Sequence, residues 1–389
     1  MYTTHMIDRM ILPRLRRSKK SVLLLGPRQV GKSTLCQALN PSFSVNLADE
    51  ALFLAYSKDP GRLRRELAAR PRAVRVMIDE IQRVPSLLNT IQALVDEKPG
   101  FQFLLTGSSA RKLKRGGANL LPGRIVLEHL DPLNYWECGE RFNLERCLRL
   151  GSLPGIFLDD SSGEDVLDAY ASVYLREEIQ AEMTVKNIGG YARFLDVAAE
   201  ASGRWTNYSK VASDAELPKE TVRRFFEVLE ETLMVFRIPS FRARHSPRRL
   251  SQRDRFVLFD VGVRNALLGV HREILSPTER GGLFEHWFLL QCLYFIRAQK
   301  KGWRVQSYRT EAGAEVDVVI DRGRDFLAVE CKYGKQATEA DLGGLRSFEE
   351  VAGKPVKKFL VYRGDSPQKF HRGEWAMPYE RFLNEELRS

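Results

Sequence analysis

The chain has 389 residues, 43% of them hydrophobic, and a formal net charge of +11. This length exceeds one typical domain, so we expect two or three domains. Its apolar content is ordinary for a folded protein. No run of about 18 apolar residues occurs, so we expect no membrane-spanning helix. The N-terminal residues show no apolar core before a small-residue cleavage site, so we expect no signal peptide.

The five cysteines are scattered and form no Cys-x-x-Cys pair. This spacing predicts neither a disulfide framework nor a zinc site, and it favours a reducing, cytoplasmic location. The positive charge favours a polyanionic partner, most simply nucleic acid, with an anionic membrane surface as the weaker option. An arginine-rich source genome would give the same charge, and composition alone does not separate these explanations.

The strongest chemical signal is a glycine-rich loop between a strand and a helix. Residues 21–25, SVLLL, read as an apolar strand, and residues 26–33, GPRQVGKS, match the pattern G-x-x-x-x-G-K-[ST]. The next residues, up to 39, read as a helix stopped by the Asn-Pro pair at 40–41. The order of strand, loop and helix predicts a phosphate-binding P-loop.

The chemistry of this loop needs particular residue types. Gly26 and Gly31 let the backbone curl so that its N–H groups point at phosphate oxygens. Lys32 is expected to reach the terminal phosphates, and the Ser33 hydroxyl is expected to ligate Mg²⁺. The predicted nucleotide-binding residues are Gly26, Pro27, Arg28, Gln29, Val30, Gly31, Lys32, Ser33 and Thr34, together with Asp79 of the next motif.

A second acidic motif follows on another apolar strand. Residues 73–82, AVRVMIDEIQ, end in a pair of carboxylates. Asp79 is expected to hold Mg²⁺ through water, and Glu80 to orient or deprotonate the attacking water. An acidic pair after a core strand is common on protein surfaces, but beside a P-loop we interpret it as catalytic.

Two later segments add candidate catalytic residues. The strand in residues 101–113, FQFLLTGSSARKL, ends in polar residues that could lie beside the γ-phosphate, with Thr106 as first choice and Ser108 as second. Arg124 follows a Pro-Gly turn and could reach the γ-phosphate of a neighbouring subunit's nucleotide. On spacing alone, an ordinary exposed arginine is the favoured interpretation of Arg124.

The segments GPRQVGKST, MIDEIQ, LLTGSSARKL and LPGRIVLEHLDPL together resemble the bacterial and archaeal AAA+-type ATPases that carry a C-terminal restriction-endonuclease-like domain of uncharacterised function. The resemblance covers nearly the whole chain. It implies an α/β fold in which the Thr106 strand lies between the P-loop strand and the Asp79 strand. It also makes Arg124 a candidate arginine finger, and with it implies a homo-oligomer, a dimer or a ring that could be hexameric.

The expected domains are an AAA+-type P-loop ATPase core at 1–150, a helical lid and winged-helix segment with a basic loop at 151–255, and a restriction-endonuclease-like domain at 256–389. A Gly/Pro-punctuated stretch near residue 150 supports the first boundary. The lid is expected as a helix over residues 164–183, in which Arg176 could sense the phosphates or pair with a nearby glutamate.

Residues 205–241 read as a winged helix-turn-helix. Asn207 is expected to cap a short helix, a second helix follows at 219–231, and LMVFRIPSF is expected to form the wing hairpin. On the second helix, the groove-facing candidates are Thr221, Arg223 and Arg224. A winged helix can also serve only as a spacer or a protein contact.

The arginine-rich segment that follows favours DNA. Residues 237–255 hold seven arginines and the single acid Asp254. Arginine binds phosphate oxygens in bidentate fashion, and such contacts give salt-dependent affinity without sequence choice. A solvated loop is the alternative.

The C-terminal part resembles a restriction-endonuclease core. A helix at 281–299 is expected to carry Glu285 in its first turn, and the strands EVDVVI and FLAVECK carry Asp317, Glu330 and Lys332. Asp317 and Glu330 would hold a second Mg²⁺ or Mn²⁺, with Glu285 as accessory ligand, and Lys332 would act as a catalytic residue that positions water. The alternatives are structural pairing of these charges, or a degenerate nuclease fold that only binds DNA; cleavage itself is left open.

The sequence therefore predicts an ATP-hydrolysing protein that processes duplex or branched DNA, with metal-dependent cleavage as an added option. The rival hypothesis is a nucleotide-dependent regulatory or defence switch whose C-terminal domain docks a protein partner. DNA-stimulated ATP turnover would separate the two hypotheses.

Overall fold

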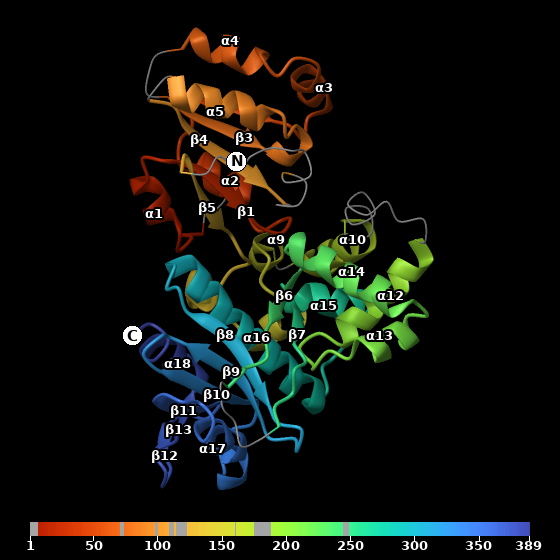
Figure 1. The fold of residues 1–389 in the computed structure, drawn as a ribbon, viewed down its shortest axis with the longest axis vertical. Coiled ribbons are helices and arrows are strands. Elements are labelled where there is room, and N and C mark those ends of the chain that lie inside the picture. Colours follow the sequence, from red (N-terminus) through yellow and green to blue (C-terminus); the bar gives the residue numbers. More distant parts are fainter. Residues whose placement is uncertain are drawn as a thin grey trace. The chain divides into compact units, whose positions relative to one another are not determined.

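The computed structural model divides the chain into two compact units (Figure 1). The N-terminal unit comprises Met1–Glu140, Leu153–Gly155 and Glu227–Met234, and the C-terminal unit comprises Arg141–Ser152, Ile156–Phe226 and Val235–Ser389. The structure describes residues 7–70, 74–97, 100–108, 113, 123–159, 161–174, 188–243 and 249–389. None of the helices in these ranges is long and apolar enough to cross a bilayer.

The N-terminal unit is built on a five-stranded sheet in the order β2-β3-β4-β1-β5. Its strands are β1 (Ser21–Leu25), β2 (Phe43–Asn46), β3 (Arg75–Asp79), β4 (Gln102–Gly107) and β5 (Ile125–His129), and all neighbours pair in parallel. The position of β4 between β1 and β3 confirms the predicted place of the Thr106 strand. In a parallel sheet the carboxyl ends of the strands share one edge, so the loops after β1, β3 and β4 lie together.

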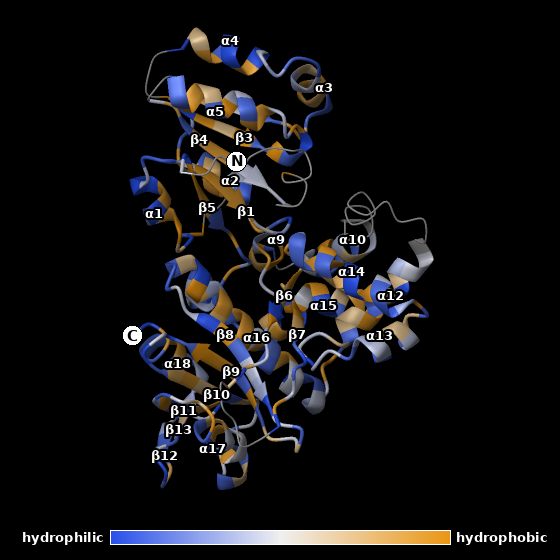
Figure 2. Ribbon diagram, in the orientation of Figure 1, coloured by the Kyte–Doolittle hydropathy of each residue, from blue (hydrophilic) through white to orange (hydrophobic). Residues whose placement is uncertain are grey.

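Helices of the N-terminal unit cover this sheet. They are α1 (Leu12–Arg17), α2 (Lys32–Gln37), α3 (Glu50–Lys58), α4 (Arg62–Ala68), η1 (Ile81–Arg83), α5 (Leu87–Glu97) and α7 (Tyr135–Cys138). α3, α4 and α5 share one apolar core with the strands, and Figure 2 shows hydrophobic residues along β3 and β4. α5 contributes Leu87, Ile91 and Leu94, which recur at helical spacing and so fall on one buried face.

Short helices open the C-terminal unit. They are α8 (Leu144–Leu150), α10 (Gly163–Ala169) with a π turn at Tyr170–Tyr174, α12 (Ile188–Glu200), α13 (Tyr208–Asp214) and α15 (Val261–Leu267). α14 (Lys219–Glu231) begins in this unit, and its residues from Glu227 onward belong to the N-terminal unit. Asn207 caps α13 as predicted, accepting hydrogen bonds from the backbone N–H groups of Ser209 and Lys210. The expected lid helix reaches into residues 175–187, which include Arg176 and lie outside the described residues.

The predicted wing is wrong in its pairing. β6 (Val235–Ile238) does not fold back within residues 233–241 but pairs antiparallel with β7 (Arg255–Leu258). Between them, Ser240 forms a β-bridge with Ser307 of β8 (Arg304–Arg309), and Leu250 forms one with Thr310, directly after β8. The described part of the arginine-rich segment is therefore anchored to a sheet edge, and its last arginine belongs to a strand; residues 244–248 lie outside the described residues.

The second sheet has six strands in the order β12-β13-β11-β10-β9-β8. After β8 come β9 (Glu315–Asp321), β10 (Phe326–Lys332), β11 (Val356–Tyr362), β12 (Gln368–Lys369) and β13 (Trp375–Pro378). β8, β9 and β10 are antiparallel neighbours, whereas β10, β11 and β13 run parallel, so the sheet is mixed. The predicted strands EVDVVI and FLAVECK are β9 and β10.

Three helices accompany this sheet: α16 (Pro277–Gln299), α17 (Gly343–Glu349) and α18 (Tyr379–Glu385). α17 packs Leu345 and Phe348 into the sheet core. Its approach is close at Gly344, where an added Cβ would lie 1.8 Å from the Glu315 carbonyl oxygen, whereas a Cβ on Gly343 would meet nothing within 4 Å.

α16 begins earlier than the sequence prediction of residue 281. Ser276 caps it in a capping box with Glu279, and Pro277 occupies the first turn, where its missing N–H costs nothing. The two glycines at 281 and 282 therefore lie inside the helix. Glu285 is consequently in the body of α16 and not in its first turn, as had been predicted.

Candidate functional site

The P-loop follows β1 and needs both of its glycines. A Cβ on Gly26 would lie 2.2 Å from the Leu130 carbonyl oxygen, which no side chain can tolerate. Gly31 adopts a φ of +87°, in the left-handed region that favours glycine. Gln29 also has positive φ, at 61°. The loop is thus shaped by steric requirements that the sequence pattern already indicated.

Lys32 lies inside this loop. Its side chain is buried, and Nζ donates hydrogen bonds to the carbonyl oxygens of Gly26 at 3.0 Å and Pro27 at 2.8 Å. The ammonium group is thereby held among the backbone groups of residues 26–33, which is where phosphate oxygens would lie.

A hydrogen-bond network joins the predicted residues at the ends of three strands. Ser33 Oγ lies 2.7 and 2.9 Å from the two carboxylate oxygens of Asp79. Thr106 Oγ1 donates to Asp79 and accepts from the backbone N–H of Glu80 at 3.1 Å. The structure therefore brings together the loop after β1, the end of β3 and the end of β4.

Gln82 belongs to the same site, although the sequence analysis assigned it no role. Its Nε2 donates to the Glu80 carboxylate and to Ser108 Oγ, the latter at 3.1 Å. Its Oε1 is buried and has no partner in the described part of the chain. A Cβ on Gly107 would approach this oxygen to 2.8 Å, so the glycine leaves room for the glutamine. Gln82 sets the direction of Glu80, whose backbone has a φ of +57°.

Arg9 is a second residue that the sequence analysis missed. Its buried guanidinium donates to the carbonyl oxygen of Val30 at 2.7 Å and to that of Asp131 at 2.5 Å, and Nε lies 3.1 Å from Glu137. These contacts link the P-loop to the segment around residues 131–137. No local pattern reveals them, because the partners are distant in the sequence.

The residues of this network fit a nucleotide with Mg²⁺. Ser33 and Asp79 present a hydroxyl and a carboxylate side by side, and hard divalent cations prefer such oxygen donors. Lys32 supplies positive charge within the same loop. Gly26 and Gly31 give the loop its shape, through the close approach to the Leu130 carbonyl oxygen and the positive φ of Gly31.

Arg124 is not part of this network. It immediately precedes β5, and its Nε lies 2.5 Å from Asp96 of α5. In the parallel register, Ile125 is opposite Ser21 and His129 is opposite Leu25. Arg124 is therefore at the edge of the sheet opposite the P-loop, and its role toward a neighbouring subunit's nucleotide stays a prediction.

The predicted residues of the C-terminal unit lie close to one another. Asp317 on β9 is buried, and its Oδ2 accepts a hydrogen bond from the Cys331 N–H at 2.9 Å. Glu330 on β10 has one carboxylate oxygen that is buried without a hydrogen-bond partner among the described residues. Lys332 Nζ lies 3.8 Å from Glu330 and 3.6 Å from Asp341, so it is an ion-pair partner of both.

Burial and mutual repulsion shift the protonation of these carboxyls. Burial raises the pKa of Asp317 well above its usual range, the charges of Glu285 and Glu330 raise it further, and Arg255 opposes the rise. Burial also raises the pKa of Glu330 to about 8, against the lowering effect of Lys332. Among the described residues, no hydroxyl donates to these carboxyls, whereas Ser33 and Thr106 donate to Asp79.

Glu285, predicted as an accessory metal ligand, lies against an arginine in the structure, and its role toward a metal stays a prediction. Its carboxylate forms an ion pair with Arg255, whose side chain is only 3% exposed. Among the residues with described positions, no three His, Cys, Asp or Glu side chains lie at metal-binding spacing. The predicted ligand set Glu285, Asp317 and Glu330 is therefore not assembled as a metal site.

Comparison with known families agrees with the geometry of the N-terminal unit. Residues 18–139 match the family model of an AAA domain. Residues 141–273 and 280–382 match two models described as domains of unknown function, DUF8612 and DUF4143. The protein is thus an α/β protein in which a parallel P-loop-type sheet is followed by a helical middle and a mixed sheet.

Two relatives are themselves uncharacterised. Protein Rv2008c of Mycobacterium tuberculosis is 28% identical over 314 residues, which cover 78% of this chain and 68% of that protein. Protein MJ1637 of Methanocaldococcus jannaschii is 23% identical over 231 residues, covering 57% of this chain and 47% of that protein. Similar sequences therefore occur in a bacterium and in an archaeon, and the names of these two proteins give no activity.

Two solved structures show a distant likeness to this chain. A signal transduction ATPase (STAND protein) with a tetratricopeptide repeat sensor from Pyrococcus horikoshii aligns with a TM-score of 0.24 at 14% identity, over 75% of this chain and 47% of that chain. A DNA polymerase III gamma subunit-related protein from Thermotoga maritima gives 0.27 at 10% identity, over 58% and 99%. The AAA match alone carries the comparison.

Proposed function

We propose that the N-terminal unit hydrolyses ATP with Mg²⁺. The observation that carries this proposal is the network at one sheet edge, where Ser33, Asp79 and Thr106 are linked directly beside the P-loop. The match of residues 18–139 to an AAA domain supports it.

Each residue of the site has a distinct task. The backbone of residues 26–33 and Lys32 bind the phosphates and offset their charge. Ser33 and Asp79 are placed to hold Mg²⁺, which supplies charge stabilisation at the phosphates when bound. Glu80 orients the attacking water and accepts its proton, with Gln82 fixing the carboxylate. Thr106 positions Asp79 and the Glu80 backbone beside the γ-phosphate.

Two substitutions test the ATPase proposal. Lys32→Ala should abolish binding of a fluorescent ATP analogue and with it phosphate release. Glu80→Gln should keep the binding but lower phosphate release by about 10²-fold or more, because a general base contributes about 10²–10⁴-fold. Lys20→Ala, an exposed lysine just before β1, is the matched control. Wild-type turnover in both Lys32→Ala and Glu80→Gln would refute the proposal.

We further infer that the C-terminal unit contacts DNA. Arg242, Arg249 and Arg253 are exposed, and none of their side chains has a partner in the part of the chain that is described. On α14, Arg224 is likewise exposed, while Arg223 pairs with Glu220 at 3.3 Å and Thr221 is half-buried. Together with the net charge of +11, unpaired arginines favour a polyanion. The resemblance of the C-terminal sequence to restriction-endonuclease-like proteins is consistent with the same partner.

ATP turnover with and without DNA tests this part of the proposal. If DNA is the partner, duplex, single-stranded or branched DNA should stimulate phosphate release, and a labelled duplex should shift on a gel at low salt. If none of the three DNA forms changes the rate of ATP turnover and no gel shift is seen, the rival hypothesis is favoured. In that hypothesis the protein is a nucleotide-dependent switch whose C-terminal unit docks a protein.

A further inference from the structure

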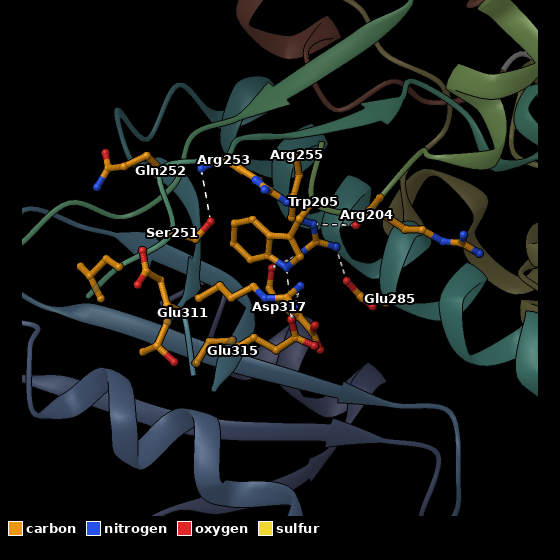
Figure 3. A pocket seen from close by; sticks show the side chains of 15 residues that line it. Arg204, Trp205, Ser251, Gln252, Arg253, Arg255, Glu285, Glu311, Glu315 and Asp317 are labelled. Carbon is orange, nitrogen blue, oxygen red and sulfur yellow. Dashed lines mark hydrogen bonds and ion pairs between the residues drawn. The ribbon is translucent and has the colours of Figure 1, made fainter. Parts of the chain in front are cut away.

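A cavity of about 750 Å³ opens in the C-terminal unit beside β8 and β9 (Figure 3). Its volume lies within the range of ligand pockets. The indole of Trp205 stands in the middle of this view, and its Nε1 donates to Glu315 at 3.1 Å. Arg253 and Arg309 line the cavity, and Arg255 lies deeper, beside Glu285 and Asp317.

Arg255 is fully engaged by its surroundings. Nε donates to the Gly203 carbonyl oxygen at 2.6 Å, Nη1 donates to the Asp317 carbonyl oxygen at 2.9 Å, and Nη2 contacts the Glu285 carboxylate. The guanidinium therefore binds three separate chain segments, and its charge lies beneath the cavity among the carboxylates. A buried charge needs this degree of pairing to be tolerated.

The residues do not fit the metal ion that the nuclease likeness implies. Glu285 is occupied by Arg255, and Lys332 pairs with Glu330 and Asp341. The described residues also contain no three-ligand cluster at metal spacing. Arg255, a side chain of the protein itself, supplies the positive charge beside these carboxylates.

We propose that Arg255 is a built-in cation among these carboxylates, and that the cavity above it binds a DNA strand without a divalent metal and without cleaving it. This inference rests on the DNA contact proposed above and is independent of ATP hydrolysis.

The chemistry of the rim favours a phosphodiester strand. Arg253 is exposed with no side-chain partner among the described residues. Arg309, which is 41% exposed, pairs with the Glu315 carboxylate at 3.5 Å and lies 5.9 Å from the Trp205 ring. Arginine matches phosphate geometry, and arginine beside an aromatic ring is a common arrangement for single strands. Below the rim, Arg255 pairs with the Glu285 carboxylate and so offsets its charge.

The rim is also held in place before any ligand binds. Ser251 N–H donates to the Arg309 carbonyl oxygen at 2.9 Å, and Leu250 forms a β-bridge with Thr310, the residue after β8. Arg253 thus projects from backbone that is anchored to the edge of the sheet. Prior ordering lowers the entropy cost of binding.

Anisotropy of a labelled DNA oligonucleotide tests the binding site in the full-length chain. Wild type should bind equally, within about twofold, in EDTA and in Mg²⁺. Arg253→Ala and Arg309→Ala should each weaken binding several-fold and reduce the slope of log affinity against log salt by about one. Arg324→Ala removes an exposed arginine of the β9–β10 turn that does not line the cavity, and it should match wild type.

The outcomes separate this inference from the DNA contact itself. If wild type binds no DNA in any buffer, the DNA proposal fails, and this inference fails with it. If wild type binds but both cavity variants match it, or if binding needs Mg²⁺ or Mn²⁺, only the inference about this cavity is overturned.

A count of bound Mn²⁺ by electron paramagnetic resonance tests the built-in cation. Wild type, Asp317→Asn and Glu330→Gln should bind the same number of ions, because the ATP site is common to all three. One Mn²⁺ fewer in either variant, with thermal unfolding showing that the variant is folded, would overturn the proposal. So would DNA cleavage by wild type in Mg²⁺ or Mn²⁺ that Asp317→Asn lacks.

Discussion

Asp79 and Asp317 are both strand residues that are 9% exposed, yet their surroundings differ. Asp79 is met by the hydroxyls of Ser33 and Thr106, which add no charge. Asp317 is met by a backbone N–H and lies near two other carboxylates and Arg255. Hydroxyl partners are neutral donors beside the Asp79 carboxylate, whereas Arg255 places a positive charge beside Asp317. The neighbours, more than the aspartate itself, decide whether such a site takes up a metal.

The largest expected difference between the two sites is in the effect of matched substitutions on ATP turnover. Asp79→Asn should lower ATP turnover by about 10²-fold or more, because it removes the carboxylate that holds Mg²⁺. Asp317→Asn should leave turnover within about twofold of wild type. Phosphate release at saturating ATP measures both. Equal losses in the two variants would contradict the assignment of hydrolysis to the N-terminal unit alone.

Arg255→Met should destabilise the C-terminal unit by about 3 kcal/mol, because it leaves Glu285 without its buried partner. Urea unfolding followed by tryptophan fluorescence measures this, since Trp205, Trp287, Trp303 and Trp375 all belong to that unit. Arg381→Ala breaks an exposed pair with Glu385 and should cost less than about 1 kcal/mol. Similar losses in the two variants would argue against a special role for Arg255.

Gln82→Ala should lower kcat about tenfold with little change in KM, because it frees the Glu80 carboxylate without altering the P-loop. Gln82→Glu should be worse, since it places a second negative charge against Glu80. Gln92→Ala, on the half-buried part of α5, is the control. A rise in KM with unchanged kcat would instead place Gln82 in nucleotide binding.

The smallest expected effect is a pH dependence in the C-terminal unit. Glu330 has a pKa raised from 4.5 to about 8, so the folded state holds its proton more tightly than the unfolded chain. Its contribution to stability is fully present below pH 4.5 and is lost as the pH rises toward 8. At pH 9, the free energy of unfolding of Glu330→Gln, measured by urea denaturation, should therefore exceed that of wild type by about 1 kcal/mol. At pH 5, the two free energies should differ less. The opposite order would contradict the burial of this carboxyl.

The side chains that meet beside the P-loop could be predicted to lie together because their sequence pattern is local. A strand, a glycine-rich loop and an acidic strand end each occupy a few consecutive residues, and parallel strands bring such ends to one edge. Arg9 could not be found in this way, since it acts on Val30 and Asp131 through the tertiary fold. Gln82 lies only two residues after Glu80, so the motif includes it. The sequence analysis gave it no role because glutamine carries no charge that marks it as catalytic.

The errors in the C-terminal unit have equally specific causes. The glycines at 281 and 282 suggested a helix start, although the Ser-x-x-Glu pattern at 276–279 is a capping box. The wing was placed in consecutive residues, whereas β6 pairs with a strand beyond a long connection. Arg255 was counted with the loop arginines because a charge run does not reveal which member is buried.

The pair Gly343–Gly344 shows how differently two adjacent identical residues can be constrained. At Gly344 any side chain would collide with the Glu315 carbonyl oxygen, and Glu315 holds Trp205 at the cavity. At Gly343 a side chain would meet open space. In a library of random variants, position 344 should accept almost no replacement while position 343 accepts many. A family alignment could show this asymmetry as one invariant column beside a variable one.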